Sequence, residues 1–486
     1  MRHTLRFLLG DEPRAIESID PTLTVLDWLR LEERRVGTKE GCAEGDCGAC
    51  TVVVGRLAEG QVRYEAVNAC IRFLATLDGC QLLTVEHLKR PDGTLHPVQH
   101  AMVDRHGSQC GFCTPGFVMS LYALWLNEDR PDVPRIKDVL AGNLCRCTGY
   151  APIIAAAQAM YDIRAKPEDR PADAAARLQA LQDDETLSIG AAGRRFQAPA
   201  TLPALAQLLA EEPQATLVAG ATDVGLWVTK FQRVLPSVIY LGRVAALRRI
   251  AETDSAIEIG GGVTYSEAAP ALARLYPDLG ELLRRLGAVQ VRNVGTIGGN
   301  IANGSPIGDT PPALIALDAT LVLCRGAARR SLKLEDFFLA YGKQDRQKDE
   351  IVEYVSIPKL SSAAKFRAYK ITKRFDQDIS AVCGAFLVEL TDGKVARIRI
   401  AFGGMAGTPK RATATEQALL GQAWTQASIE TAQQALAGDF TPLDDWRASA
   451  AYRRMIAANL LLKFFVETCD PAAETRLVGA RSLAHA

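Results

Sequence analysis

Two groups of four cysteines in the first 150 residues constrain the fold of this chain more than any other feature of its sequence. The first group has the form C-x4-C-x2-C with one cysteine downstream, and comprises Cys42, Cys47, Cys50 and Cys70. The second joins a C-x2-C pair to a C-x-C pair, and comprises Cys110, Cys113, Cys145 and Cys147. Thiols at such spacings indicate two centres with sulfur ligands.

Composition excludes several other classes of function. The 486 residues suffice for about three domains, and 48% of them are apolar. Lys plus Arg and Asp plus Glu both count 56, which gives no electrostatic footprint for nucleic acid or an anionic membrane. No stretch approaches the roughly 18 apolar residues of a membrane span. We therefore expect a cytoplasmic protein, in which twelve cysteines are too many to be explained as disulfides.

The first cysteine group has the spacing of a plant-type [2Fe–2S] cluster. Its loop contains Gly41, Gly45 and Gly48, which let the backbone fold tightly and direct N–H groups at the sulfurs. A four-cysteine zinc site is the alternative. Zinc ribbons usually pair two short cysteine knuckles, however, whereas here three ligands crowd one loop.

Each pair of the second group stands just before a predicted helix, one opened by Pro115 and the other near Ile153. Both helix N-termini therefore point at the thiolates. Two ferric ions, two sulfides and four thiolates carry a charge of about −2, which helix dipoles and free N–H groups favour. On spacing alone zinc is more plausible here than in the first group, but the neighbouring iron–sulfur motif argues against it.

The remaining candidate ligands are weaker. Four cysteines are isolated, and we interpret them as structural: Cys80, Cys324, Cys383 and Cys469. His96 and His100 form only a weak metal spacing, and we interpret them as surface residues.

The order of predicted elements divides the chain. Residues 165–185 are rich in Pro, Ala and charge, which is typical of a linker. Before it, residues 3–19 alternate as a hairpin does, Thr24 caps a short helix, and Val98 to about Ile163 reads as a helical bundle. After it, an α+β domain is expected to about residue 360. Three strands follow, at 366–372, 381–390 and 397–402, and then helices.

Two glycine-rich loops lie in this second half. LVAGATDVG (217–225) follows a predicted strand and enters a helix, so its N–H groups could cradle a phosphate. GTIGGNIANGSPIGD (295–309) has five glycines, which indicate close approach of the backbone to a ligand; an ordinary irregular loop is the alternative. The sequence has neither a Walker P-loop nor a Rossmann fingerprint.

With these motifs in this order, the sequence resembles the xanthine dehydrogenase family of molybdenum hydroxylases, specifically the bacterial small subunit. The resemblance covers nearly the whole chain and rests on EGCAEGDCGACTV, VNAC, QCGFCTPGFVMS, GNLCRCTGY, LVAGATDVG and TIGGNIANGSPIGD. It implies a multi-domain α+β fold. The parts are a β-grasp ferredoxin-like [2Fe–2S] domain (1–88), a helical [2Fe–2S] domain (89–164), the linker (165–185), a vanillyl-alcohol-oxidase-like FAD-binding domain (186–360) and a C-terminal domain like that of carbon monoxide dehydrogenase flavoproteins, with a three-stranded sheet and helices (361–475).

The resemblance also implies FAD contacts. The pyrophosphate would lie on Leu217, Val218, Ala219, Gly220, Ala221, Thr222, Asp223 and Val224. Phosphate and ribitol would meet Thr296, Ile297, Gly298, Gly299 and Asn300, and Asp309 would bind a ribose hydroxyl. Val352 and Lys370 match flavin-contact positions, whereas Leu286 stands where many relatives have a Phe packed against the flavin. The loop at 370–378 resembles the segment that influences whether NAD⁺ or oxygen takes the electrons.

A partner is implied as well. It would be a large subunit carrying molybdenum–molybdopterin, in a heterotetramer of two small and two large subunits, and Gln109 and Cys147 match the positions nearest the pterin. The active site for oxidation of hypoxanthine or xanthine to urate would lie on that partner, so no catalytic residue is expected here. Electrons would cross the two clusters singly to FAD, which passes a hydride to NAD⁺.

Other functions remain open on the sequence alone. The chain could serve a molybdenum hydroxylase that acts on aldehydes or other N-heterocycles, because the substrate contacts belong to the partner. It could be a stand-alone iron–sulfur flavoprotein that shuttles electrons between NADH and a carrier. A zinc-stabilised binding module without a redox role is the third alternative.

Overall fold

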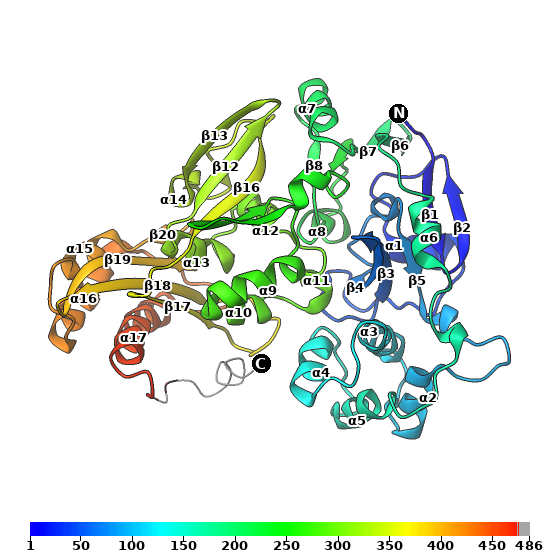
Figure 1. The fold of residues 1–486 in the computed structure, drawn as a ribbon, viewed down its shortest axis with the longest axis horizontal. Helices are drawn as coiled ribbons and strands as arrows, with labels where there is room; N and C mark the ends of the chain where they lie inside the picture. The colour runs from blue at the N-terminus through cyan, green and yellow to red at the C-terminus, as the bar shows by residue number, and fades with distance from the viewer. Residues whose placement is uncertain (474, 476–486) are drawn as a thin grey trace. The chain divides into compact units, whose positions relative to one another are not determined.

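The computed structural model describes residues 1–473 and 475, and the chain forms two compact units. Unit 1 comprises Met1–Ala245 with Gly287–Gly295, and unit 2 comprises Ala246–Leu286 with the chain from Thr296 onward (Figure 1). Residue 474, part of the predicted last domain, lies outside the described residues. The predicted domain boundaries stay predictions.

The first domain of unit 1 is a mixed five-stranded sheet of order β2-β1-β5-β3-β4, in which β1 and β5 are parallel. Its strands are β1 (Leu5–Leu9), β2 (Glu12–Ile16), β3 (Thr51–Ala58), β4 (Gln61–Asn68) and β5 (Gln81–Leu83). The predicted hairpin is confirmed as β1 and β2. Thr24 caps α1 (Val25–Asp27) by accepting from the Asp27 N–H at 3.0 Å, and the helix continues as a π-helical turn, η1 (Trp28–Glu32).

The predicted helical bundle is confirmed. Its helices are α2 (Pro97–Asp104), α3 (Thr114–Asn127), α4 (Val133–Leu140) and α5 (Ala151–Ala159), after the 3₁₀ turns η2 (Leu74–Leu77) and η3 (Val85–Leu88). They gather beside the first sheet (Figure 1). Helix α3 packs on β3 and β4, and Phe117 and Leu121 share a buried core with Val53. The first sheet therefore supports α3, the helix that follows Cys110 and Cys113.

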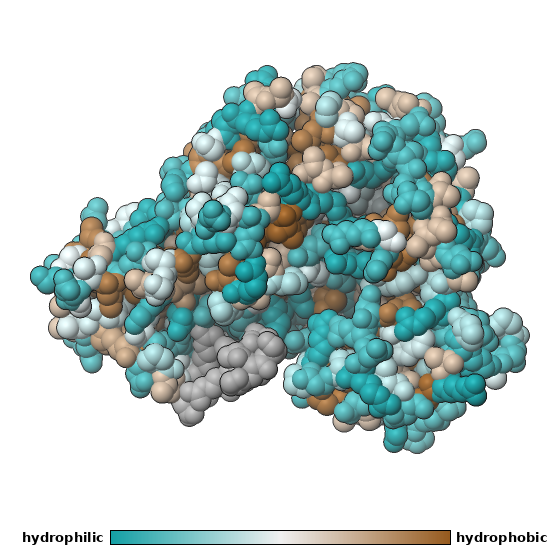
Figure 2. All heavy atoms as spheres, in the orientation of Figure 1, coloured by the Kyte–Doolittle hydropathy of each residue, from teal (hydrophilic) through white to brown (hydrophobic). Residues whose placement is uncertain are grey.

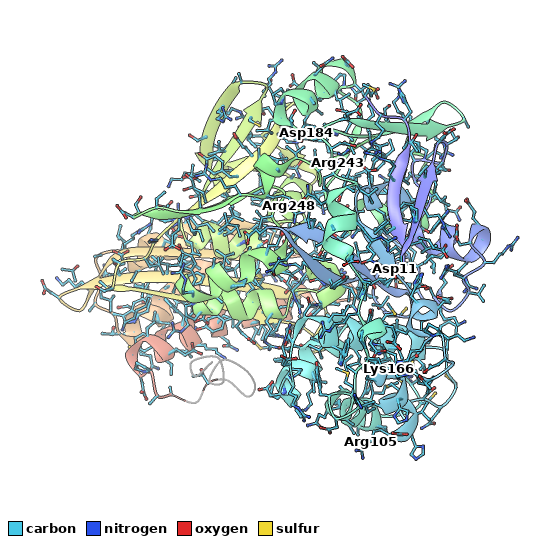
Figure 3. The ribbon with its side chains drawn as sticks, turned by 45° about the vertical axis from the view of Figure 1, so that its right-hand side comes forward. Asp11, Arg105, Lys166, Asp184, Arg243 and Arg248 are labelled. Atoms are coloured by element: carbon cyan, nitrogen blue, oxygen red, sulfur yellow. The ribbon has the colours of Figure 1, made fainter. Side chains whose placement is uncertain are left out.

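The stretch expected to be a linker is more ordered than its composition suggests. It contains η4 (Pro167–Asp169) and α6 (Ala174–Gln179), and Ala174 and Leu178 are buried. Lys166 (Figure 3) pairs with Asp92 at 2.5 Å. Residues four apart lie on the same side of a helix, so Ala174 and Leu178 give α6 a small buried face. The assignment of this stretch as a linker stays a prediction.

The rest of unit 1 is a four-stranded sheet of order β6-β7-β9-β8. Its elements are β6 (Leu187–Ala191), β7 (Arg194–Ala198), α7 (Leu202–Glu211), β8 (Thr216–Val218), α8 (Val224–Thr229), β9 (Ser237–Tyr240) and, from the second segment, α11 (Val289–Arg292). Phe196 and Val238 join the core that Phe7 and Leu26 form beneath the first sheet. The two sheets of unit 1 thus share one core.

Unit 2 contains two large antiparallel sheets and a two-stranded one. The first, of order β10-β11-β16-β12-β13, packs against Tyr265, Leu282 and Leu314. Its part of the chain holds η5 (Ala245–Arg248, which spans the division between the units), β10 (Ile250–Glu252), β11 (Ala256–Gly260), α9 (Tyr265–Leu275), α10 (Pro277–Arg284), α12 (Ile297–Asn303), α13 (Thr310–Ala316), β12 (Thr320–Arg325), β13 (Ala328–Lys333), α14 (Leu334–Phe337), β14 (Phe338–Ala340), β15 (Lys343–Gln344) and β16 (Ile351–Pro358).

The last part of unit 2 confirms the three predicted strands and adds a short fourth one. The sheet runs β17 (Ala364–Ile371), β18 (Val382–Thr391), β19 (Lys394–Gly403) and β20 (Lys410–Arg411), each antiparallel to the next. The helices are α15 (Thr413–Leu419), α16 (Gln426–Asp439) and α17 (Ala450–Cys469). Phe386, Phe402 and Phe464 fill the space between this sheet and its helices.

Polar and charged side chains cover most of the face shown in Figure 2. None of the helices in residues 1–473 is long and apolar enough to cross a membrane.

Candidate functional site

The structure brings the first cysteine group together. The Cys42 thiol is hydrogen-bonded to the thiols of Cys47 and Cys70, and Cys50 is hydrogen-bonded to Cys70. The loop before β3 supplies three of these residues, and the turn after β4 supplies Cys70. The antiparallel pair of Thr51 with Asn68 holds the two ends of the group beside each other.

Backbone N–H groups point at these sulfurs, as predicted. Cys42 accepts hydrogen bonds from the N–H groups of Cys47, at 3.4 Å, and Glu44. The N–H of Ala49 donates a hydrogen bond to the Cys47 sulfur, and the N–H groups of Ala69 and Cys70 donate to the Cys50 sulfur. Fixed donors of this kind stabilise anionic sulfur.

The titration of the first group indicates what it can hold. Hydrogen bonds from Cys47 and Cys70 keep the pKa of the Cys42 thiol far below its usual range. The same bonds raise the pKa of Cys47 and of Cys70, because each shares its proton with Cys42. Thiolates this close together repel one another, and the iron core of a [2Fe–2S] cluster would supply the compensating charge.

The second cysteine group is also assembled. Cys113 is hydrogen-bonded to Cys145, and Cys110 to Cys147. Cys113 is the residue at which α3 begins, and α5 begins shortly after Cys147, so both predicted helix starts are confirmed. Cys110 and Cys147 are exposed, whereas Cys145 is buried.

The polar surroundings of Cys145 favour a thiolate. Burial raises the pKa of this thiol, but hydrogen bonds from the Thr148 side chain and from backbone N–H groups outweigh burial and bring the pKa to about 7. The Thr148 hydroxyl lies 3.2 Å from the Cys145 sulfur. The Tyr150 hydroxyl accepts from the Cys145 N–H at 3.0 Å, and Tyr150 has a left-handed φ of 69°. Burial likewise raises the pKa of Cys113, to about 12.

Both groups fit a [2Fe–2S] cluster in donor chemistry. Each group offers four thiols linked by hydrogen bonds, and a two-iron cluster takes four thiolates. Within the described residues no three His, Cys, Asp or Glu side chains surround one position as the ligands of a single ion. Gly41 leaves room for the sulfurs, since a Cβ there would lie 2.8 Å from the Cys47 sulfur. The isolated cysteines differ: Cys80, Cys324 and Cys383 are buried, and Cys469 is exposed.

The predicted FAD residues of unit 1 form a strand, loop and helix, as expected. Residues 219–223 connect β8 to α8, and Ala221 has a left-handed φ of 59°. A Cβ on Gly220 would lie 2.0 Å from the Val294 oxygen and 3.0 Å from the Gly295 Cα. The loop therefore lies directly on the segment Gly287–Gly295, and only glycine fits at position 220.

The predicted FAD residues of unit 2 come from several elements: Thr296 to Asn300 lie at the start of α12, Val352 lies on β16 and Lys370 lies on β17. Much of the second glycine-rich stretch is helix, because the Thr296 hydroxyl caps α12 by accepting from the Gly299 N–H at 3.0 Å. A Cβ on Gly298 would lie 2.5 Å from the Gly261 Cα. Val352 and Leu286 both pack against the core of unit 2.

Asp309 and Lys370 form a buried ion pair in unit 2. The Lys370 ammonium donates to one carboxylate oxygen of Asp309 at 2.5 Å, and the Ser380 hydroxyl donates to the other at 2.5 Å. Lys370 also donates to Ser380 at 3.0 Å. The sequence analysis missed Ser380. No local spacing relates it to Asp309, and only the pairing of β17 with β18 brings it there.

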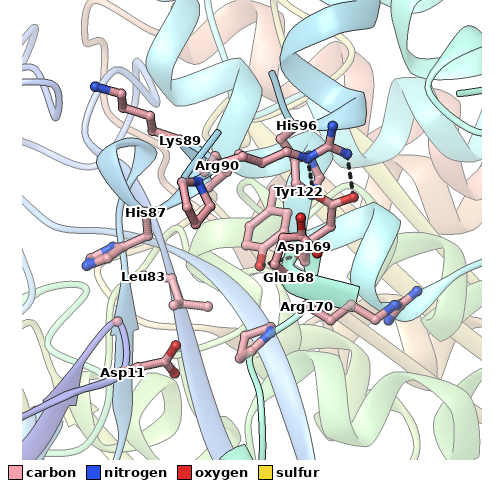
Figure 4. Close-up of a pocket in the computed structure, with 14 residues that line it drawn as sticks. Asp11, Leu83, His87, Lys89, Arg90, His96, Tyr122, Glu168, Asp169 and Arg170 are labelled. Carbon is pink, nitrogen blue, oxygen red and sulfur yellow. Dashed lines mark hydrogen bonds and ion pairs between the residues drawn. The ribbon is translucent and has the colours of Figure 1, made fainter. Parts of the chain in front are cut away.

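A polar pocket of about 240 Å³ lies elsewhere in unit 1, beside the stretch predicted as a linker (Figure 4). The Arg90 guanidinium donates to both oxygens of Asp169, at 2.7 and 2.6 Å, so its charge is paired. His96 also lines this pocket and is buried, which corrects its interpretation as a surface residue: its Nδ1 caps α2, and burial lowers its pKa to about 4. The residues that line the pocket include none of the predicted cluster or FAD residues.

Four family models match successive parts of the chain. They are a 2Fe-2S iron-sulfur cluster binding domain (residues 9–74), a [2Fe-2S] binding domain (84–158), an FAD binding domain in molybdopterin dehydrogenase (187–360) and a CO dehydrogenase flavoprotein C-terminal domain (367–468). The chain therefore contains two [2Fe–2S]-binding domains and an FAD-binding domain, in the predicted order.

The relatives agree with these matches. The chain is 33% identical to xanthine dehydrogenase of Drosophila subobscura over 96% of this chain and 39% of that protein. It thus spans about two fifths of the length of the curated relatives it matches. Carbon monoxide dehydrogenase from Hydrogenophaga pseudoflava is 28% identical, with a TM-score of 0.53 over 55% of this chain and 94% of that chain. Quinoline 2-oxidoreductase from Pseudomonas putida 86 is 25% identical, with a TM-score of 0.52 over 57% of this chain and 97% of that chain.

The order of the matched domains, the assembled cysteine groups and these relatives lead to one conclusion. The chain carries four successive domains that match those of the iron–sulfur and FAD subunit of molybdenum hydroxylases.

Proposed function

We propose that this chain is the electron-transfer subunit of a cytoplasmic xanthine dehydrogenase. It receives electrons from a molybdenum–molybdopterin centre on a separate large subunit and delivers them through two [2Fe–2S] clusters and FAD to NAD⁺. The observation that carries this proposal is the assembly of two complete cysteine groups in one compact unit, which also contains the predicted pyrophosphate loop.

The residues of the chain would divide this work. Cys42, Cys47, Cys50 and Cys70 would hold one cluster, and Cys110, Cys113, Cys145 and Cys147 the other. Residues 217–224 would bind the pyrophosphate, and 296–300 with Asp309, Val352, Lys370 and Leu286 would serve the rest of FAD. Iron–sulfur clusters carry one electron at a time, whereas a flavin collects two and releases them as a hydride.

The second cysteine group offers a surface for the partner. Gln109, Cys110 and Cys147 are exposed there, together with Phe112 and Tyr150. Exposed aromatic side chains next to exposed thiols suit a buried protein interface better than open water. We propose that the large subunit covers this face, in an assembly of two small and two large subunits.

The loop after β17 supports NAD⁺ as the acceptor. It begins after Ile371, next to Lys370, and its Phe375 ring contacts the guanidinium groups of Arg284, at the end of α10, and Arg285. The Arg285 guanidinium donates to the Phe375 oxygen, at 3.1 Å from Nη2, and lies 4.2 Å from the centre of the Phe375 ring. A fixed loop at this position would shape the access of a nicotinamide to the flavin.

Xanthine is the proposed substrate because the xanthine dehydrogenases match nearly the whole chain. The similarity to quinoline 2-oxidoreductase favours a second candidate, a subunit that serves an enzyme for another N-heterocycle. The substrate contacts of either enzyme would lie on the partner, so this chain would perform the same transfer in both.

The proposal predicts a division of labour between the subunits. The isolated chain should oxidise NADH with an artificial dye, because the flavin half-reaction requires only the FAD-binding domains. It should not hydroxylate xanthine, since activation of water for attack on a purine carbon requires the molybdenum centre. Addition of the large subunit should produce xanthine-dependent NADH formation.

Two rates test this prediction, NADH to dye and xanthine to NAD⁺, measured before and after reconstitution. Purine hydroxylation by the chain alone would overturn the two-subunit proposal. A reconstituted complex that oxidises quinoline or an aldehyde but not xanthine would select the second candidate. A chain that purifies from its host with no molybdenum subunit bound would indicate a stand-alone NADH reductase.

A second prediction concerns the pyrophosphate loop. Gly220→Ala should lower FAD content severalfold, because a Cβ that close to the Val294 oxygen must displace the loop. Flavin absorbance per chain measures the effect. Gly438→Ala is a suitable control, since Gly438 lies in α16 without a left-handed φ and a Cβ there meets nothing within 4 Å. Equal FAD content in both variants would refute the assigned role of the loop.

A further inference from the structure

We propose that Gln290 is a positioning residue for electron transfer between the two cysteine groups. Its buried amide holds Asn143, and through Asn143 it holds the hydrogen bond that joins one cysteine group to the other. The inference rests on the proposed function, because it requires a cluster in each group.

The two groups are linked by a single backbone hydrogen bond in unit 1. The Leu144 N–H donates to the Cys47 carbonyl oxygen at 3.0 Å. Cys47 belongs to the first group, and Leu144 is covalently bonded to Cys145 of the second. A route of covalent bonds and one hydrogen bond therefore connects the groups without a through-space gap. Electronic coupling decays less steeply along such a route than across van der Waals contact.

Asn143 fixes the geometry of this link. Its amide nitrogen donates to the Gly48 oxygen at 3.1 Å and to the Thr51 hydroxyl at 3.3 Å. Its amide oxygen accepts from the Ser120 hydroxyl at 2.7 Å. Asn143, next to Leu144, is thus hydrogen-bonded to Gly48, next to Cys47, and Ser120 holds the other end of the Asn143 amide.

Gln290 completes this network from a distant part of the sequence. Its Nε2 lies 3.1 Å from the Asn143 amide oxygen, 3.2 Å from the Ser120 hydroxyl and 3.3 Å from the Thr51 hydroxyl. The residue is 1% exposed and lies in α11, within the segment Gly287–Gly295. The same segment supports Gly220 of the predicted pyrophosphate loop.

The backbone segments around Gln290 are closely packed, so the position of its side chain affects the position of the backbone. A Cβ on Gly48 would lie 2.1 Å from the Gly142 oxygen, and one on Gly116 would lie 2.2 Å from the Gly48 oxygen. A Cβ on Gly142 would lie 2.0 Å from the Gln290 Oε1. No flexible side chain separates these segments, so a displaced Gln290 shifts the backbone that carries the link.

The transfer itself is a one-electron step. The donor centre is oxidised by the loss of one electron, and the acceptor centre is reduced by the gain of that electron. No covalent bond forms or breaks, and Leu144 keeps its proton. What Gln290 contributes is the distance and alignment of the Leu144 N–H and the Cys47 oxygen.

The test compares Gln290→Met with the parent in the full chain purified with its iron–sulfur centres. Methionine has nearly the same length but cannot hold Asn143. After flash reduction, rapid-freeze EPR follows the electron as it equilibrates between the two centres. We expect full iron content, both EPR signals and an equilibration about tenfold slower, because a small misplacement of an aligned pair has a large effect on rate.

Gln81→Met is the matched control. Gln81 is 0% exposed in the same unit, and its Nε2 donates to the Gly10 oxygen at 2.9 Å, outside the network around Asn143. In both glutamines Oε1 is buried without a hydrogen-bond partner in the part of the chain that the structure describes. A merely structural role for Gln290 would lower the melting temperature of both variants and leave both rates unchanged.

Ser120→Ala serves as a second variant in case Gln290→Met does not fold. It removes one hydrogen bond to Asn143 with little change in volume, and the rate should fall by a smaller factor. Parental rates in the folded variants would overturn the inference. A parent chain that contains no iron would instead overturn the proposed function.

Discussion

A Cys113→Ser chain is expected to retain about half of its iron and one of its two paramagnetic signals. Cys113 meets the Cys145 thiol and stands at the start of α3, so its loss opens the second cysteine group. A serine hydroxyl is a poor substitute, because the soft iron–sulfur core selects thiolate. The first group draws its ligands from a different loop and should keep its cluster.

Metal analysis and EPR of the reduced chain measure this result, with about four irons per parent chain expected. Cys80→Ser is the matched control in unit 1, because its buried sulfur contacts the Asp78 oxygen at 3.7 Å and lies outside both groups. Zinc in the second site would contradict the assignment. Loss of both signals in Cys113→Ser would show that the two centres do not form independently.

Parts of the cysteine groups could be anticipated because the geometry of those parts is local. Cys42, Cys47 and Cys50 lie within one turn-rich loop, and Gly45 and Gly48 take the left-handed φ values of 81° and 69° that such a loop requires. The helix starts near Cys113 and Tyr150 follow from prolines at the first turns. Features of this kind are determined within a few residues.

The structure adds two short helices that the local composition does not indicate. The glycines around 298 argue against a helix, but the Thr296 cap and Gly304, at a φ of 63°, define α12 at both ends. In the stretch predicted as a linker, the apolar face of α6 is too small to stand out from the alanines around it. Each helix forms because its ends or its packing outweigh its composition.

The other contacts depend on the tertiary fold and could not be found from spacing. Gln290 reaches Asn143 only because Gly287–Gly295 belongs to unit 1 whereas the chain on either side of it belongs to unit 2. Ser380 meets Asp309 only through the pairing of β17 and β18. The family resemblance supplied Asp309 as a ligand contact, and the structure adds that both of its oxygens already accept hydrogen bonds from the protein.

Asp309→Ala is expected to destabilise unit 2 by about 3–5 kcal/mol, because it leaves the Lys370 ammonium buried and without its carboxylate. The Lys370 side chain is 2% exposed and that of Asp309 is 7% exposed, so water cannot replace the lost partner. Thermal unfolding of the FAD-free chain measures this effect. If Asp309 also accepts a ribose hydroxyl, FAD affinity should fall by a further ten- to hundredfold, about 1–3 kcal/mol.

Two variants separate these effects. Asp309→Ala combined with Lys370→Met should recover most of the lost stability, because replacing both members of a buried pair removes the uncompensated charge. Asp162→Ala breaks an exposed pair with Arg130, 2.6 Å apart, and should change stability by about 1 kcal/mol or less. If the melting temperature of Asp309→Ala falls no further below that of the parent than the melting temperature of Asp162→Ala does, Lys370 must find another partner. Full FAD affinity in a stable Asp309 variant would exclude the ribose contact, since the carboxylate would then serve Lys370 and Ser380 alone.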